Sequence, residues 1–189
     1  MGRRRRLIVG ISGASGALYG IRVLEMLRNL DVETHLIVSR AAELTLACET
    51  DLTLQTLTAM ADACHRVEDL TAAPASGSFS SLGMIIAPCS IRTLSEIATG
   101  TTSSLLTRAA DVTLKERRRL VLMVRETPLH LGHLRTMVTA AEIGAVIAPP
   151  VPAFYTRPET LADVITQSVG RVLDLFGLEA EGVGRWREA

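Results

Sequence analysis

The stretch Leu7-Ile-Val-Gly-Ile11 followed by Ser12-Gly-Ala-Ser-Gly-Ala17 decides the fold. A short apolar run ends in a turn of small residues, and a helical pattern begins directly after it. Such a turn brings backbone N–H groups and the positive end of the helix dipole together, which favours a phosphate. A single glycine-rich turn of this kind is required by the fold alone about as often as it forms a binding site. Its glycines match neither the dinucleotide fingerprint nor the phosphate loop that carries Lys before Ser or Thr.

Strand and helix patterns alternate along the rest of the chain. Further strands are predicted at residues 33–38, 84–87, 120–124 and 145–148. Helices are predicted at 18–30, 41–48 and 52–63, from the N-cap Ser90 through 110, at 130–142, and around Leu161, Ile165, Val172 and Phe176. The strands are continuous apolar runs, which is typical of a parallel sheet with helices on both faces. We therefore predict one α/β domain over residues 1–189, with a basic tail at 1–6 and a C-terminal tail at 177–189.

Composition excludes several classes of function. The 189 residues are 48% hydrophobic and carry a formal net charge of +0, so nucleic-acid binding lacks its electrostatic driving force. The run Arg3 to Arg6 is interpreted as a solvated tail, because the apolar stretch behind it is too short for a signal peptide. No apolar run approaches the roughly 18 residues of a membrane span. Three cysteines without a Cys-x-x-Cys pattern are typical of a reducing cytoplasm.

Ligands of open parallel sheets bind beyond the carboxyl ends of the strands. In this chain those ends carry small polar groups, a cation and a carboxylate, in Gly13 to Ser15, Ser39, Cys89 to Thr93, Arg125 with Glu126, and residues 149–155. A charged pair directly after a buried strand, as Arg125 and Glu126 are, indicates a site. The set suits a phosphorylated ring better than a protein surface.

Other polar residues have ordinary structural explanations when each is taken alone. His130 and His133 lack a carboxylate at a recognised metal-binding spacing, so no metal site is predicted. Cys89 is better explained as a small buried residue than as a nucleophile. Solvated or packing roles are favoured individually for Lys115, Tyr155 and Arg171.

Eight segments together carry a resemblance that extends over nearly the whole chain. They are Gly10-Ile-Ser-Gly-Ala-Ser-Gly-Ala-Leu-Tyr-Gly20, Glu49-Thr-Asp51, Ala75-Ser-Gly-Ser78, Pro88-Cys-Ser-Ile-Arg-Thr-Leu94, Arg108-Ala-Ala-Asp-Val-Thr-Leu-Lys-Glu-Arg-Arg118, Arg125-Glu-Thr-Pro-Leu-His-Leu131, Gly144-Ala-Val-Ile-Ala-Pro-Pro150 and Pro152-Ala-Phe-Tyr155. These segments resemble the UbiX-type flavin prenyltransferases. Arg92 and Arg119 depart from the family pattern, and neither departure removes a catalytic group.

The resemblance implies a Rossmann-like, flavodoxin-like fold and a defined reaction. Enzymes of this family transfer the dimethylallyl group of dimethylallyl monophosphate to N5 and C6 of reduced FMN without a metal ion. The prenylated FMN serves UbiD-type decarboxylases, usually in ubiquinone biosynthesis. The family assembles as a dodecamer with its sites at subunit interfaces, so a cytoplasmic homo-oligomer without nucleic-acid or membrane partners is expected.

The same resemblance assigns roles to individual residues. FMN is expected to contact Gly13, Ala14, Ser15, Ser39, Ser90, Ile91, Arg92, Thr93 and Arg125. The prenyl phosphate is expected to contact Lys115, Tyr155 and Arg171, and the catalytic residues are expected to be Ser15, Glu49 and Glu126. Cations and a phenol on the phosphate oxygens would stabilise the charge that grows as the allylic C–O bond breaks. Glu126 would relay a proton between the flavin N5 side and the departing phosphate, with Ser15 completing the relay.

Two other functions compete with this interpretation. An FMN-dependent decarboxylase of cysteine peptides or phosphopantothenoylcysteine shares the flavoprotein architecture, but its Pro-x-Met-Asn-x-x-Met-Trp motif is replaced here by Pro88-Cys-Ser-Ile-Arg-Thr-Leu94 and Pro149-Pro-Val-Pro152. The second alternative is a non-catalytic FMN-binding subunit of a phenolic-acid decarboxylase, which would need no second phosphate site. Dimethylallyl monophosphate and diphosphate both stay open as donors.

Overall fold

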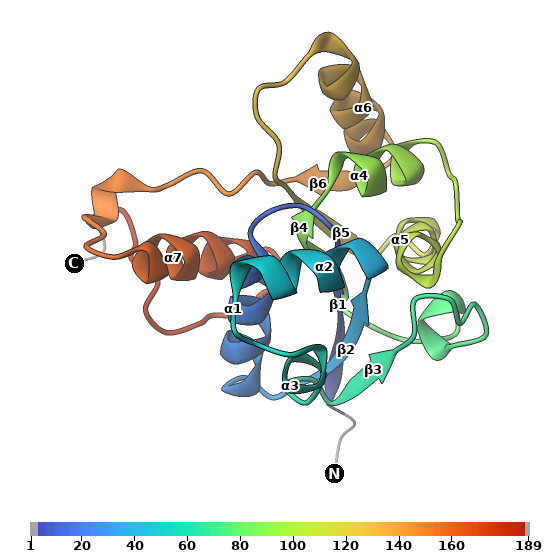
Figure 1. The fold of residues 1–189 in the computed structure, drawn as a ribbon, viewed down its shortest axis with the longest axis horizontal. Helices are drawn as coiled ribbons and strands as arrows, with labels where there is room; N and C mark the ends of the chain where they lie inside the picture. The colour runs from blue at the N-terminus through green and yellow to red at the C-terminus, as the bar shows by residue number, and fades with distance from the viewer. Residues whose placement is uncertain (1–3, 188–189) are drawn as a thin grey trace.

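A six-stranded parallel sheet forms the centre of the computed structural model, which describes residues 4–187 (Figure 1). The strands are β1 (Arg5–Ile11), β2 (Val32–Val38), β3 (Ala63–His65), β4 (Gly83–Cys89), β5 (Arg119–Val124) and β6 (Ala145–Ile147). They lie in the order β3-β2-β1-β4-β5-β6, and every neighbouring pair is parallel. The predicted α/β class and parallel sheet are therefore confirmed.

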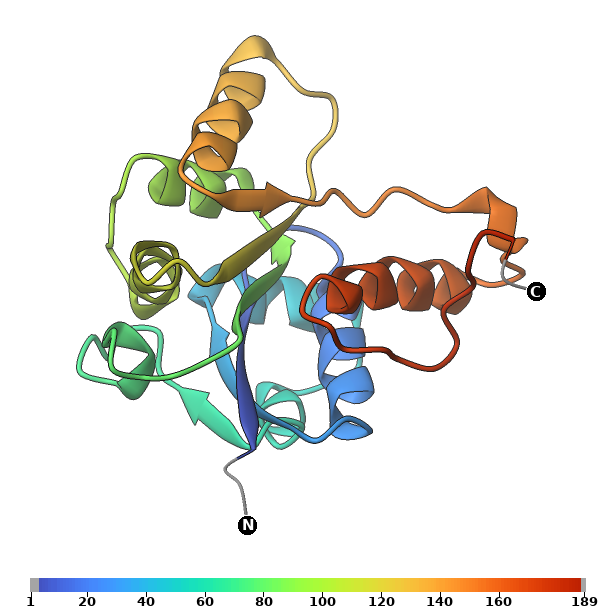
Figure 2. The ribbon, with the colours of Figure 1, turned by 180° about the vertical axis from the view of Figure 1, so that it is seen from behind.

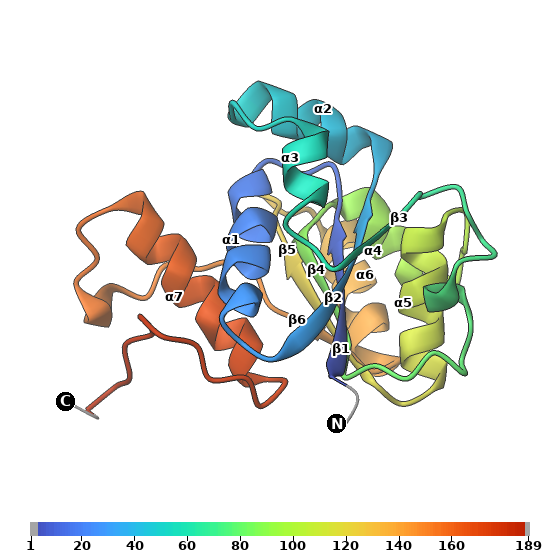
Figure 3. The same cartoon turned by 90° about the horizontal axis from the view of Figure 1, so that it is seen from below.

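Helices cover both faces of the sheet (Figure 3). One face packs against α1 (Ala17–Arg28) and α7 (Leu161–Asp174), and the other against α4 (Ile91–Ala98), α5 (Leu105–Lys115) and α6 (Leu131–Glu142). The segment between β2 and β3 contains α2 (Arg40–Glu49) and α3 (Leu54–Thr58), and two short 3₁₀ turns are η1 (Ala73–Ala75) and η2 (Phe154–Thr156).

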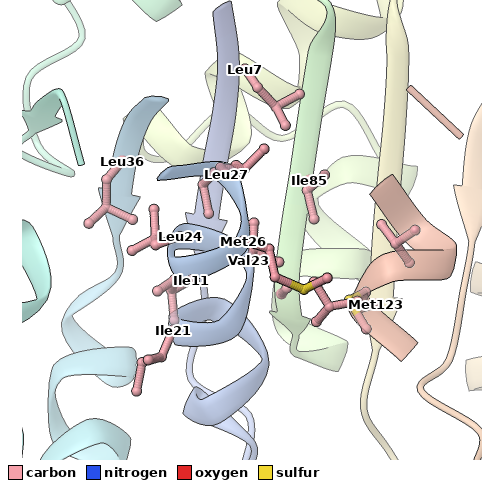
Figure 4. Packing of buried hydrophobic residues seen from close by; sticks show 14 of the residues in the cluster. Leu7, Ile11, Ile21, Val23, Leu24, Met26, Leu27, Leu36, Ile85 and Met123 are labelled. Carbon is pink, nitrogen blue, oxygen red and sulfur yellow. The ribbon is translucent and has the colours of Figure 1, made fainter. Parts of the chain in front are cut away.

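Alternate residues of each strand enter two separate cores because successive strand side chains point to opposite faces. On β1, Leu7, Val9 and Ile11 enter the core under α1 and α7, whereas Ile8 enters the core under α4, α5 and α6. Figure 4 shows the first of these cores, where leucines of α1 meet side chains of the central strands. Burial on both faces explains why the strands appear as continuous apolar runs in the sequence.

The chain reverses its direction of travel across the sheet between β1 and β4. From β1 it moves outward through β2 to β3, then returns to the centre and moves the other way through β4, β5 and β6. The reversal leaves the turn after β1 beside the turn after β4, and such a switch point is where ligands bind in doubly wound folds.

Two predicted helices are shorter than the sequence pattern indicated. The prediction for residues 52–63 was wrong beyond α3, because Thr53 caps a five-residue helix and the chain then enters β3, which the analysis missed. The helical pattern predicted to continue through residue 110 is interrupted between α4 and α5. Gly100, with a φ of +69°, follows the end of α4, and a capping box at Ser104 starts α5.

The basic N-terminal run begins the sheet rather than ending before it. Strand β1 starts at Arg5, two residues before the predicted start, and Arg6 forms a 3.2 Å ion pair with Glu33 of β2. Arg4 forms ion pairs with Asp31 at 3.2 Å and Asp62 at 2.7 Å. Arg3 lies outside the described residues. These ion pairs continue the β1–β2 pairing to the amino end of the strands.

Two histidines on neighbouring strands form a hydrogen-bonded pair at the outer part of the sheet. His35 Nδ1 lies 2.9 Å from His65 Nε2, and His35 Nε2 lies 2.9 Å from a carboxylate oxygen of Glu33. The two rings stack, and Phe79 meets the buried His35 ring edge-on. Partial burial lowers the pKa of His65 below its usual 6.5, with His35 adding to the effect and Asp69 opposing it.

Acid should therefore weaken the fold through His65. The unfolded chain takes up this proton near the usual pKa of 6.5, whereas the folded chain takes it up only at lower pH, so the stabilisation is complete above about pH 6.5 and is lost as the pH falls through the lowered pKa. We expect the thermal midpoint of the wild-type protein to fall between pH 7 and pH 5 more steeply than that of His65→Gln. Equal pH slopes for the two proteins would contradict this assignment.

Candidate functional site

The carboxyl edge of the sheet collects three helix N-termini. The turn after β1 leads into α1, Ser39 begins α2, and Ser90 begins α4. Gly13 permits the close approach of the first two, because a Cβ on Gly13 would lie 2.3 Å from the Cβ of Ala41. The predicted residues Gly13, Ala14, Ser15, Ser39 and Ser90 therefore lie on one edge.

Glu49 occupies the N-terminus of α1. Its carboxylate accepts hydrogen bonds from the N–H groups of Gly16 at 2.9 Å and Ala17 at 2.9 Å, and thereby caps a helix whose own N-cap residue is a glycine with φ of +107°. Burial acts to raise the pKa of Glu49, but hydrogen bonds from the Ser15 side chain and these two N–H groups, together with Arg125, hold it below the usual value. Glu49 is thus an internal anion at the turn where the sequence predicted a phosphate.

The N-termini of α2 and α4 keep backbone donors for a ligand. Ser39 Oγ accepts from the Ala42 N–H at 3.1 Å, and Ser90 Oγ accepts from the Thr93 N–H at 3.2 Å. Within residues 4–187, no hydrogen bond is formed by the N–H groups of the positions between each cap and its partner, Arg40, Ala41, Ile91 and Arg92. An anion is favoured at such N–H groups by the helix dipole.

Arg125 and Glu126 follow β5 at the same edge, and both are exposed. The Arg125 N–H donates to the carbonyl of Cys89 at 3.0 Å, which joins the segment after β5 to the end of β4. Burial raises the pKa of Tyr19, whereas the Arg125 charge opposes this rise and also lowers the pKa of Glu49. The Arg125 guanidinium therefore acts on the N-terminal part of α1, beside Ser15 and Glu49.

Tyr155 and Arg171 belong to a second cluster, which lies away from this edge. They line a cavity of about 620 Å³ between α7 and the C-terminal segment. Arg171 forms a 2.7 Å ion pair with Asp174, and Arg185 binds the same carboxylate, so the pKa of Asp174 is lowered first by Arg185. The connection from β6 to α7 runs outward from the sheet before the chain returns as α7, as Figures 1 and 2 show.

Two residues of the second cluster were missed by the sequence analysis. Trp186 meets the Tyr155 ring edge-on with a centroid distance of 5.4 Å, and Arg185 binds Asp174. Buried Gln167 holds the cluster together, because its amide donates to Tyr155 Oη at 3.2 Å and exchanges hydrogen bonds with the backbone of Gly184. The only signal in the sequence was that Trp186 is the single tryptophan of the chain.

The side chains of Lys115 and Arg92, also predicted as site residues, contact neither the residues at the carboxyl edge nor the second cluster within this chain. Lys115 ends α5, on the opposite face of the sheet from α7 and next to the start of β5, and its ammonium lies 2.5 Å from Glu116. Arg92 projects into solvent, with 85% of its side chain exposed, and pairs with Glu96 on its own helix. Cys89 is fully buried, and burial raises the pKa of its thiol, as expected for a packing residue.

A parallel sheet with unused helix N–H groups at its switch point defines an α/β protein of the class that binds phosphorylated ligands. In the described part of the chain, no group of three or more His, Cys, Asp or Glu side chains is arranged to hold a metal ion. Nor does any helix within residues 4–187 have the length and apolar character needed to cross a membrane.

Comparison with known proteins identifies the family. Residues 1–169 match the family described as Flavoprotein. The chain is 62% identical to the flavin prenyltransferase UbiX of Escherichia coli K12 over 188 residues, which cover 98% of this chain and 100% of that protein. The chain therefore belongs to the flavin prenyltransferases of the flavoprotein family.

Solved structures agree with this assignment. The crystal structure of AnUbiX (PadA1) in complex with FMN and dimethylallyl pyrophosphate superimposes with a TM-score of 0.97 at 51% identity, covering 99% of this chain and 100% of that one. A dodecameric FMN-dependent UbiX-like decarboxylase from Escherichia coli O157:H7 superimposes with a TM-score of 0.94 at 46% identity, covering 96% of this chain and 99% of that one.

Removal of the Glu49 charge should destabilise the protein even without ligands. Glu49→Gln weakens the cap of α1 by about 0.5–1 kcal/mol, at the low end for caps because the side chain is largely exposed to solvent. Thermal unfolding at pH 7 should show a lower midpoint for Glu49→Gln than for wild type. Glu43→Gln serves as the control, because Glu43 lies on α2 like Glu49. Because the pKa of Glu49 is lowered, the difference should shrink as the pH falls from 4.5 through the lowered value. A pH-independent difference would argue against a charge effect.

Proposed function

We propose that this protein transfers the dimethylallyl group of dimethylallyl monophosphate to N5 and C6 of reduced FMN, and so makes prenylated FMN. The proposal is supported by family membership and, above all, by one observation on the chain. Side chains and N–H groups that suit a phosphate occur in two separate places. The edge with Arg125 and the helix N-termini suits FMN, and the cluster of Tyr155 and Arg171 suits a second phosphate. FMN storage alone requires only the first of these.

At the edge, the chain's own groups would bind and orient the flavin. The free N–H groups of α2 and α4 would bind an anion, and Arg125 would add a charge-assisted contact. Glu49, whose pKa is lowered by Ser15 and by the Gly16 and Ala17 N–H groups, would lie with Ser15 at the reaction centre. Glu126, exposed at the same edge, would carry a proton between the flavin N5 side and the departing phosphate.

At the second cluster, protein cations would replace the metal ion that most prenyl transfer requires. As the allylic C–O bond breaks, negative charge grows on the phosphate, and Arg171 and the Tyr155 hydroxyl would stabilise it, together with Lys115 of another subunit. The related AnUbiX structure contains the pyrophosphate, so the monophosphate and the diphosphate should be compared directly as donors.

We further propose that each site is completed between subunits of a homo-oligomer. Lys115 lies on the α5 face of the sheet, whereas Tyr155 and Arg171 lie with α7 on the other face. Exposed apolar side chains on α6 and on the β6–α7 connection favour burial against further copies, among them Leu131, Val138, Val151 and Phe154. A dodecamer is the proposed assembly, as in the E. coli O157:H7 relative. The UbiD-type partner and the cytoplasmic location stay predictions from the family resemblance.

The two alternative functions are less well supported. This chain lacks the motif of the cysteine-peptide decarboxylases. It is 62% identical to a flavin prenyltransferase over 98% of its length. A non-catalytic FMN-binding subunit would not account for the cluster of Tyr155, Arg171 and Trp186. Anaerobic incubation with reduced FMN and dimethylallyl monophosphate, followed by mass spectrometry of the flavin, distinguishes the transferase from both alternatives, because only the transferase adds a five-carbon group.

Arg171→Ala should separate prenyl transfer from flavin binding. Loss of one charge-assisted contact to the phosphate should slow turnover by about a hundredfold, while the FMN dissociation constant stays unchanged. Arg22→Ala is a matched control, because Arg22 and Glu25 form a 2.9 Å pair on α1 with the same three-residue spacing as Arg171 and Asp174. Titration with FMN and anaerobic turnover measure the two effects. Loss of FMN binding in Arg171→Ala with full activity of the remaining holoenzyme would favour a simple flavin-binding role.

Mixed oligomers test whether a site draws on more than one chain. Lys115→Ala and Arg171→Ala proteins, each poorly active alone, are co-expressed with different tags and purified through both. If the two residues reach a site from different subunits, random mixing restores about a quarter of the sites, because these receive both intact side chains. If both residues come from one chain, activity stays at the level of the single variants, and the proposed assembly is wrong.

A further inference from the structure

Ser12 bridges the two turns that meet at the switch point of the sheet. It follows β1 directly and is 1% exposed. Its hydroxyl donates a 2.9 Å hydrogen bond to the carbonyl of Pro88 and accepts a 2.8 Å hydrogen bond from the N–H of Ser90. The Ser12 N–H also donates to the Pro88 carbonyl, at 3.2 Å. We call Ser12, Pro88 and Ser90 the switch-point bridge.

The bridge controls which donors remain for a ligand at α4. The Ser90 N–H is bound by Ser12, and the Ser90 hydroxyl is engaged with Thr93, so Ser90 is held from both sides. The same residue organises the turn before α1, because the Ser12 carbonyl accepts a 2.9 Å hydrogen bond from the Ala14 N–H. One buried side chain thus fixes the spacing between the turn after β1 and the N-terminus of α4.

A hydroxyl is the group that this position requires. It must donate to a carbonyl and accept from an N–H at the same time, and an apolar side chain does neither. Without it, the partly buried Ser90 N–H would lose its partner, and the α4 N-terminus would shift to find another. Because Ser12 is buried, it does not itself contact a ligand at the edge.

We propose that Ser12 is a positioning residue for flavin binding, which acts by holding the Gly13–Ser15 turn and the N-terminus of α4 at the spacing that FMN requires. This inference rests on the proposed function. It predicts that the hydroxyl affects FMN affinity more than it affects turnover at saturating FMN, because the bridge lies beneath the ligand-binding turns and away from the cluster of Tyr155 and Arg171.

The test compares Ser12→Ala with a control of matched chemistry. Thr34 is also buried, and its hydroxyl likewise donates one hydrogen bond and accepts one, both with Asp62, near the amino end of β2. Thr34→Val therefore removes the same number of buried hydrogen bonds far from the switch point. We expect Ser12→Ala to raise the FMN dissociation constant about tenfold, the effect of roughly one lost hydrogen bond, and Thr34→Val to leave it within about twofold of wild type.

Two conservative variants complete the experiment. Ser12→Thr keeps the hydroxyl and should retain the wild-type dissociation constant for FMN. Ser12→Cys keeps the side-chain shape but hydrogen-bonds weakly, and its FMN dissociation constant replaces that of Ser12→Ala if the alanine variant does not fold. Flavin fluorescence measures binding, and thermal unfolding measures stability. Equal effects of Ser12→Ala and Thr34→Val on FMN affinity, or wild-type affinity in Ser12→Cys, would overturn the proposal.

Failure of the proposed function gives a different result. A wild-type protein that binds FMN but forms no prenylated product contradicts the transferase function and leaves the comparison of dissociation constants valid. A wild-type protein that binds no FMN overturns both proposals.

Discussion

Burial of a parallel sheet on both faces is the constraint on which the rest of the structure depends. Because helices cover both faces, polar groups are accommodated where the strands end, and parallel strands all end at the same edge. The reversal between β1 and β4 then separates α1 and α4 to opposite faces while their N-termini stay adjacent. The candidate flavin site is a consequence of this topology before any catalytic residue is considered.

The three helix N-termini at that edge differ in electrostatic character. Glu49 satisfies the N-terminus of α1, so that helix holds a fixed negative charge supplied by the chain. The N-termini of α2 and α4 are capped by neutral serines, which use one N–H group each and leave the others positive in character. A ligand with one anionic end therefore has a preferred orientation along the edge, with its phosphate toward α2 and α4 and away from Glu49.

The sequence predicted the elements whose burial leaves a long apolar signal, and it missed those held by other means. Strands β1, β4 and β5 contain apolar runs, β2 ends in one, and the three residues of β6 are all apolar. Strand β3 is Ala63-Cys-His65, which carries no such signal, and it depends on pairing with β2 and on the contact of His65 with His35. The edge residues were predicted because strand ends converge in any parallel sheet. Trp186 was missed because its neighbour Tyr155 is distant in the sequence and is brought to it by α7. The place of Lys115 was not predicted, although chain order carries the information, since the helix that leads into β5 ends at the edge of the sheet where β5 begins.

The separation of Lys115 from Tyr155 and Arg171 by the thickness of the sheet has a kinetic consequence. Flavin binding on the proposed function uses groups of one edge of one chain and is therefore independent of protein concentration. On the same proposal, prenyl transfer would use groups from both faces and from more than one chain, so its rate per chain would fall on dilution once the assembly dissociates. Dilution would convert the enzyme into a flavin carrier, and the concentration at which this occurs would equal the dissociation constant of the subunit contact that supplies Lys115.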